Sequence, residues 1–115
     1  MKLIKSFGYA WNGFKLAVKE EPNLKIHLVL ATIVVGMGFY FHISQMEWLI
    51  LIILVGAVIS LELINSSIEN LTDLVTKEKL PLAGKVKDIS AAAVLVFCLI
   101  ALMAGTIIFS KYIIG

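Results

Sequence analysis

Uninterrupted apolar stretches dominate the chain. Two of them, residues 26–46 and 89–110, contain no Asp, Glu, Lys or Arg. Each is long enough to cross a hydrocarbon core of about 30 Å, which takes about 20 helical residues, so each predicts one transmembrane helix. A third apolar stretch begins at Trp48 but stays uncharged only as far as Leu61. A helix that spans the membrane there must carry Glu62, and with it Asn65, to membrane depth.

The first twenty residues have a different pattern, with apolar side chains at helical spacing. One face would carry Leu3, Phe7, Trp11, Phe14 and Val18. Lysines and an asparagine occupy the other faces, which is typical of an amphipathic helix that lies in the headgroup region. The segment has no continuous apolar core and no small-residue cleavage site, so we do not expect a signal peptide. Pro22 is expected to separate this helix from the first span.

Composition supports the same class. The chain is 60% hydrophobic and only 16% charged, with a mean hydropathy of +0.97, well outside the range of soluble domains. We therefore expect an all-α membrane protein with three transmembrane helices and one N-terminal surface helix. No repeat or second domain is visible, so residues 1–115 are expected to form a single domain.

The lysines predict the orientation, since the chain contains no Arg. Five lysines precede the first span and four lie in a predicted loop over residues 74–88, which Pro81 and Gly84 mark, whereas the link HISQME has none. The positive-inside rule places the N-terminal helix and the 74–88 loop in the cytoplasm. Only Lys111 opposes this orientation.

Four polar residues follow the third apolar stretch at spacings that share one helix face. At about 100° per residue, Glu62, Asn65, Glu69 and Asp73 fall within an arc of roughly 80° over about 16 Å. We call these four residues the polar stripe. It runs from membrane depth to the aqueous end of the helix, which suits a reaction between a lipid and a water-soluble molecule.

A purely structural interpretation of the stripe competes with this one. Gly56 and Ser60 form a small-xxx-small pattern for close helix packing, and polar side chains often serve only to hold membrane helices together. For Asn65 and the two serines that follow it, packing and function both remain open. Ionisable groups at membrane depth are costly, so Glu62 and Glu69 favour function. Asp73 can be a solvated helix end.

The carboxylates suggest a metal and a phosphate. Mg²⁺ typically takes one or two protein carboxylates together with water and substrate phosphates, so either Glu20 or Glu21 can join Glu69 across a helix pair. Lys85, Lys87 and Asp88 stand at the same mouth, where an ammonium can hold a phosphate. The chain has neither GxxxxGK[ST] nor GxGxxG. By spacing alone, this metal-phosphate site is not specific.

Three segments carry a family resemblance: GYAWNGFKLAVKEEPNLKIH, ELINSSIENLTDLVTKE and PLAGKVKDISAAAVL. Together they resemble the small prokaryotic integral-membrane diacylglycerol kinases, which include the undecaprenol kinases of Gram-positive bacteria. The resemblance implies a homotrimer in the bacterial cytoplasmic (inner) membrane, with its active site at the cytoplasmic face. It also implies transfer of the γ-phosphate of ATP to a lipid hydroxyl with Mg²⁺, and no nucleic-acid partner.

The resemblance also implies roles for individual residues. Glu62 becomes the catalytic base, and Glu21 with Glu69 become the metal ligands, which also contact the nucleotide. The other implied nucleotide contacts are Lys2, Tyr9, Glu78, Lys87 and Asp88. The implied supporting or lipid-site residues are Asn65, Asp73, Trp11 and His27. Two departures are visible: Lys2 replaces an Arg and loses its bidentate fork, and Lys79-Leu80 replaces a Tyr-His beside Glu78.

Two function classes stay open at this point. One is the lipid kinase, and the other is a non-enzymatic membrane oligomer that conducts ions along the stripe. A conducting path should stay polar to the far side, but residues 48–60 contain no ionisable side chain, which favours the enzyme. A bundle of three helices is too thin to enclose such a site within one subunit, so we expect the sites to be shared between subunits. EPNLKIH resembles the undecaprenol kinase branch more than the enterobacterial diacylglycerol kinases, which implies undecaprenol rather than diacylglycerol as the acceptor.

Overall fold

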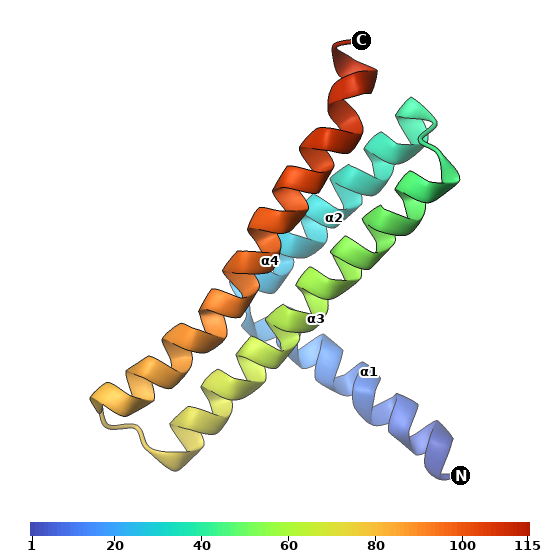
Figure 1. The fold of residues 1–115 in the computed structure, drawn as a ribbon. Helices are drawn as coiled ribbons and strands as arrows, with labels where there is room; N and C mark the ends of the chain where they lie inside the picture. The colour runs from blue at the N-terminus through green and yellow to red at the C-terminus, as the bar shows by residue number, and fades with distance from the viewer.

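The computed structural model describes residues 1–115 as four helices and no strands. They are α1 (Lys2–Glu20), α2 (Pro22–Phe41), α3 (Gln45–Val75) and α4 (Pro81–Ile113). In Figure 1, α2, α3 and α4 run alongside one another, while α1 leaves this bundle at a steep angle. The three bundle helices are long and apolar enough to cross a membrane. The all-α, three-span part of the sequence prediction is therefore confirmed.

The break between α1 and α2 lies where the sequence predicted it. Glu21 has extended backbone angles, and Pro22 opens α2 at its first helical position. Proline is favoured there because the missing N–H would have no intrahelical partner and its φ suits a helix. None of the side chains of α1 is buried. The break also leaves Glu21 beside the bundle.

The turn between α2 and α3 is earlier and tighter than the sequence predicted. The uncharged stretch 26–46 does not form one helix, because α2 ends at Phe41 and Met46 already belongs to α3. His42 adopts the left-handed conformation that ends many helices (φ 53°). Ser44 then forms a capping box with Glu47, which satisfies backbone N–H groups at the start of α3. These local contacts place a turn inside a stretch whose continuous hydrophobicity predicted a single helix.

Gly38 allows α2 and α3 to approach closely at this turn. A Cβ at Gly38 would lie 2.6 Å and 2.8 Å from two ring atoms of Trp48. The ring of Trp48 is itself held by Phe39, at a centroid distance of 4.9 Å. The tryptophan therefore has little room to move away.

We expect Gly38→Ala to destabilise the fold by about 1–3 kcal/mol, the usual cost of overpacking a tight contact. Gly36→Ala is the matched control on the same helix, since a Cβ there meets nothing within 4 Å. Unfolding of both variants in mixed detergent micelles measures the difference. Equal stability of the two variants would show that the Gly38–Trp48 contact does not matter.

The connection between α3 and α4 is shorter than the predicted loop 74–88. Only residues 76–80 are non-helical, and Pro81 and Gly84 lie in the first turn of α4 rather than in a loop. The 31 residues of α3 and the 33 of α4 measure about 46 and 50 Å. Both exceed the roughly 30 Å hydrocarbon core, so their ends at this loop extend beyond it. We call this end of the bundle the loop end.

The opposite end, where the α2–α3 turn and the C-terminus lie (Figure 1), is called the turn end. Glu47 is buried there and pairs with Lys111 at 2.7 Å, and it also accepts a hydrogen bond from the Tyr112 hydroxyl. Lys111, the one lysine that opposes the predicted orientation, is therefore paired with a carboxylate of its own chain.

Little of the chain is buried. Only 14 of 115 residues are buried, and large aliphatic side chains on all three bundle helices remain exposed. A water-soluble fold would not leave so much apolar surface uncovered. The exposed surface and the three spans identify an integral membrane protein.

Candidate active site

The polar stripe lies in the part of α3 that faces its neighbours. Glu62 is 3% exposed and Asn65 and Ser66 are each 6% exposed, although most of the chain is open. Glu69 is half-buried and Asp73 is exposed. Burial thus decreases from the middle of the bundle towards the loop end, in the order that the helical spacing predicted.

Glu62 has a single polar neighbour, which comes from another helix. His27 of α2 places its Nε2 3.6 Å from Glu62 Oε2. The other carboxylate oxygen, Oε1, makes no hydrogen bond. Because a buried carboxylate without full hydrogen bonding is costly, this arrangement is unusual for a residue that only holds helices together.

Glu21 reaches the same region from the α1–α2 break. The Ser66 hydroxyl donates a hydrogen bond to Glu21 Oε1 at 2.9 Å. Ser66 lies one turn after Glu62 and three residues before Glu69, so Glu21 lies beside the middle of the stripe. The neighbouring Glu20 ends α1, is exposed and makes no side-chain contact of this kind. Of the two glutamates left open by spacing, only Glu21 makes a side-chain hydrogen bond to α3.

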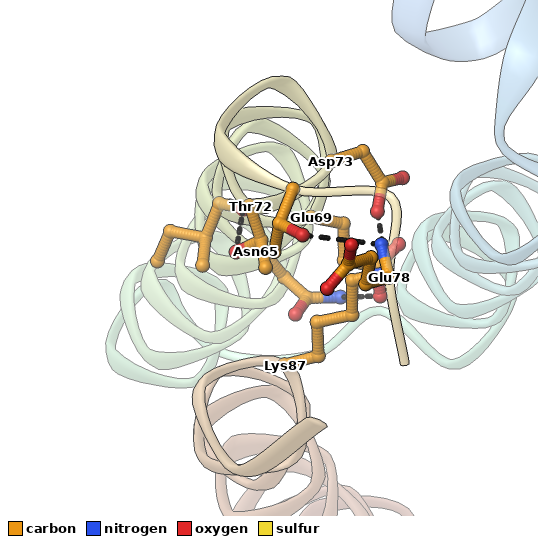
Figure 2. A network of polar contacts seen from close by, with 8 residues as sticks. Asn65, Glu69, Thr72, Asp73, Glu78 and Lys87 are labelled. Atoms are coloured by element: carbon orange, nitrogen blue, oxygen red, sulfur yellow. Dashed lines mark hydrogen bonds and ion pairs between the residues drawn. The ribbon is translucent and has the colours of Figure 1, made fainter. Parts of the chain in front are cut away.

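Asn65 and Glu69 form the next step of the stripe. Asn65 Nδ2 approaches Glu69 Oε1 at 3.5 Å, a long hydrogen bond, while Asn65 Oδ1 is buried with no partner (Figure 2). No three His, Cys, Asp or Glu side chains cluster closely enough to enclose a metal. The carboxylates of Glu21 and Glu69 and the unpartnered Oδ1 of Asn65 are nevertheless oxygen ligands. Mg²⁺ typically binds one or two such protein ligands, and phosphates and water complete its coordination shell.

A basic residue joins the stripe at the loop end. Lys87 of α4 lies 2.6 Å from Asp73 Oδ1 (Figure 2). Asp73 is therefore an ion-pair partner, not merely a solvated helix end. A cavity of about 350 Å³ opens beside this pair, and the 76–80 loop with Glu78 and the first turns of α4 line it. Carboxylates, an ammonium and a polar cavity thus meet at the loop end.

Four of the predicted site residues do not contact the stripe. Lys2, Tyr9 and Trp11 are exposed on α1, and Asp88 is exposed on α4. Trp11 instead stacks with Phe14, at a centroid distance of 6.0 Å, and lies under the ammonium of Lys15. Within one chain, the candidate site is therefore assembled from the stripe on α3, the α1–α2 break with the start of α2, and the start of α4.

An apolar groove begins at His27, the neighbour of Glu62, and runs along the bundle. It has a volume of about 730 Å³, aliphatic side chains of α2, α3 and α4 form most of its lining, and it follows α4 from Cys98 to Ile114. His27 is the only ionisable group among its lining residues besides the thiol of Cys98. The groove therefore connects the buried end of the stripe with the turn end, a feature that linear spacing did not reveal.

Comparison with known proteins identifies the family. The family described as prokaryotic diacylglycerol kinase matches residues 8–109. The chain belongs to this family. Undecaprenol kinase of Bacillus subtilis is 39% identical over 108 residues, covering 94% of this chain and 88% of the relative. Diacylglycerol kinases of Haemophilus influenzae (32%, covering 93% and 92%) and Helicobacter pylori (34%, covering 99% and 86%) are also similar.

Family membership gives the stripe its chemical context. A member of the prokaryotic diacylglycerol kinase family is a lipid kinase, a phosphotransferase with an alcohol group as acceptor. Its two substrates are ATP and a membrane lipid. The kinase prediction and the resemblance are thereby confirmed, and the ion-conducting alternative is set aside. At the buried end of the stripe, the neighbour of Glu62, His27, lines an apolar groove, and at the other end Asp73 lines a polar cavity. These two surfaces suit two such different substrates.

Sequence reasoning missed the contact that Ser66 makes. Ser66 follows Glu62 by four residues, a spacing that puts both on one helix face, and this was the available signal. Spacing left packing and function both open for Ser66, because nothing in the sequence shows which carboxylate of another helix lies opposite. The Glu47–Tyr112–Lys111 cluster was missed for the same reason.

Proposed function

We propose that this kinase transfers the γ-phosphate of ATP to the hydroxyl of undecaprenol with Mg²⁺, and that Glu62 is its catalytic base. The observation that carries the proposal is a buried carboxylate at the deep end of the polar stripe, 3.6 Å from His27, which lines the apolar groove. A lipid hydroxyl approaching through the groove would meet this carboxylate first. The nucleotide would approach from the opposite, polar end.

Glu21 and Glu69 are the proposed Mg²⁺ ligands. Both approach the middle of the stripe, and the unpartnered Oδ1 of Asn65 is a further oxygen donor there. Bound Mg²⁺ would neutralise charge on the transferring phosphate. Lys87 is proposed to hold phosphate oxygens after leaving Asp73. Glu78, in the wall of the polar cavity, is proposed to contact the nucleotide.

The chemical step needs positioning more than covalent chemistry. The acceptor oxygen attacks the γ-phosphorus and a new oxygen–phosphorus bond forms. The bond between the γ-phosphorus and the β–γ bridging oxygen breaks, and ADP leaves with that oxygen. Glu62 Oε1 accepts the hydroxyl proton as the bond forms, as a general base. The lipid phosphate then leaves along the membrane interface.

We further propose that the enzyme is a homotrimer with sites shared between subunits. Lys2, Tyr9, Trp11 and Asp88 do not contact the stripe of their own chain, so a neighbouring chain is their proposed partner. Much of the aliphatic surface of the bundle is uncovered, which leaves area for helix packing between copies. In this assembly α1 lies in the headgroup region, with Trp11 near the lipid headgroup.

The groove favours undecaprenol over the alternative acceptor, diacylglycerol. From Cys98 to Ile114 it follows α4 for about 24 Å, most of the depth of a hydrocarbon core. A single long isoprenoid chain can occupy such a length, whereas the acyl chains of diacylglycerol remain in one leaflet. The similarity to an undecaprenol kinase points the same way.

Gly105→Leu tests this acceptor site. Gly105 lines the groove, and a Cβ there meets no heavy atom within 4 Å, so leucine fills the groove without disturbing the helix. We expect kcat/KM for undecaprenol to fall about tenfold, equivalent to about 1.4 kcal/mol, with unchanged KM for ATP. A short-chain diacylglycerol should be phosphorylated at the normal rate, because it does not reach this depth.

Gly36→Leu is the matched control, since Gly36 is equally open but lies outside the groove. Phosphorylation of both lipids in mixed micelles is measured for each variant. Unchanged undecaprenol turnover in Gly105→Leu, or an equal loss with both lipids, would refute the groove as the chain site.

The proposed orientation places the loop end, and so the nucleotide site, in the cytoplasm of a bacterial inner membrane. Cysteines introduced at Ser44 and Lys79 test it, in a chain whose Cys98 is replaced by Ala. An impermeant maleimide added to intact cells should label position 44 and spare position 79, which should react only after permeabilisation. The reverse labelling pattern would invert the orientation.

A further inference from the structure

The carboxylate of Glu62 has to be both buried and correctly turned to act as a base. Glu62 is 3% exposed, and its only polar neighbour is the imidazole of His27. The other polar side-chain contacts at the site do not include Glu62. They join Asn65 to Glu69, Ser66 to Glu21, and Asp73 to Lys87. The orientation of the proposed base therefore depends on one residue of a different helix.

His27 also lies at the boundary between the stripe and the membrane. It is half-buried and lines the apolar groove beside the proposed lipid chain. Its Nε2 faces Glu62 Oε2 at 3.6 Å, while Oε1 makes no hydrogen bond. One carboxylate oxygen thus faces the histidine, and the other has no hydrogen-bond partner.

We infer that His27 is a positioning residue that orients Glu62 for proton abstraction by donating its Nε2–H to Oε2. This inference rests on the proposed role of Glu62 as base. The observed 3.6 Å is longer than a hydrogen bond. We expect this distance to shorten when the acceptor occupies the groove, since catalytic hydrogen bonds often tighten only with substrate bound. The pairing keeps Oε1 directed at the hydroxyl.

The chemistry of imidazole suits this role. A neutral histidine donates one hydrogen bond and adds no charge. A lysine or arginine at the same place would hold the carboxylate ionised too strongly for it to accept a proton readily. An apolar residue would leave Oε2 unpaired and the carboxylate free to rotate. A neutral N–H donor therefore orients the base without placing a positive charge beside it.

Two substitutions at His27 distinguish a role in orienting Glu62 from a role in helix packing alone. His27→Leu removes the donor but suits the apolar lining, and His27→Gln retains an N–H donor. With undecaprenol and saturating Mg·ATP, we expect His27→Leu to lower kcat about 10- to 100-fold, within the range of contributions from oriented acid–base groups. His27→Gln should stay within about threefold of wild type, and both should keep the KM for ATP.

Thr32→Ala is the matched control on α2, because the Thr32 hydroxyl bonds only its own helix, at Leu28 O. It should retain full turnover. Equal kcat for His27→Leu and His27→Gln, whether both are normal or both are low, would overturn the positioning role. Size-exclusion chromatography with light scattering on each variant confirms that intact oligomers are compared.

A double-substitution cycle tests whether His27 acts through Glu62. In a Glu62→Gln background, His27→Leu should cause no further loss of the residual rate. A further loss as large as in the wild-type background would mean that His27 acts independently, and would overturn the inference. Normal turnover of Glu62→Gln alone would remove the proposed function as well, whereas normal turnover of His27→Leu alone would remove only this inference.

Discussion

Glu62→Gln is expected to lower kcat about 10²- to 10⁴-fold, the usual contribution of a general base, while ATP and Mg²⁺ still bind normally. Glutamine keeps the size of the side chain but cannot accept the hydroxyl proton. Because Glu62 lies about two turns from Glu69, on the side away from the nucleotide end, the KM for ATP should not change. ATP binding and lipid phosphorylation are measured on the same purified sample.

Glu47→Gln is the matched control for this substitution. Glu47 is also a buried carboxylate of α3, but it lies at the turn end and pairs with Lys111 and Tyr112. If buried carboxylates on α3 serve only to hold helices together, both variants should lose stability and keep their turnover per folded molecule. We expect that behaviour for Glu47→Gln alone. Near-wild-type kcat in an intact Glu62→Gln oligomer would exclude the catalytic role.

The second large effect is expected at the proposed metal ligands. Glu21→Gln and Glu69→Gln should each reduce Mg²⁺-dependent turnover by at least about 10³-fold, because each removes one of two carboxylates that hold the same ion. The double variant should be little worse than either single variant, since groups that act as a unit are not additive. Initial rates are measured across a Mg²⁺ titration.

Glu20→Gln serves as the control, because Glu20 precedes Glu21 directly but lies exposed at the end of α1. It should keep normal activity and normal Mg²⁺ dependence. Substantial Mg²⁺-dependent turnover in Glu69→Gln, or multiplied losses in the double variant, would show that the two carboxylates do not share an ion.

The number of helices could be predicted from the sequence, but their limits could not. Long apolar stretches require helices in a membrane, because every backbone group must be satisfied internally. Helix ends are set by a few local contacts instead. The Ser44–Glu47 capping box and the left-handed His42 place a turn inside an uncharged stretch. Pro81 starts a helix where its composition suggested a loop.

The stripe could be predicted because it belongs to one helix. Helical spacing alone aligns Glu62, Asn65 and Glu69, and the structure buries them in the expected order. Contacts between helices depend on how α2 and α4 are rotated against α3, which spacing does not determine. The bonds of Glu21 to Ser66 and of Lys87 to Asp73 are therefore structural findings.

Three residues of α1 were assigned to the site from the sequence, but the structure does not bring them to it. The family resemblance assigns Lys2, Tyr9 and Trp11 to the site, but α1 leaves the bundle and exposes all three (Figure 1). Spacing cannot show whether a surface helix serves its own chain or a neighbouring one. Cross-linking between α1 of one subunit and the stripe of another, in the proposed trimer, would show which chain these residues serve.

The most direct test of the central claim is transfer of labelled γ-phosphate from ATP to undecaprenol by the purified protein in mixed micelles. The account predicts labelled undecaprenyl phosphate and unlabelled ADP in equal amounts, formed with Mg²⁺ and not after chelation, and faster than the phosphorylation of diacylglycerol. It also predicts almost no product with Glu62→Gln. Equal labelling of lipid by Glu62→Gln and wild type, or ATP hydrolysis without any lipid product, would contradict it.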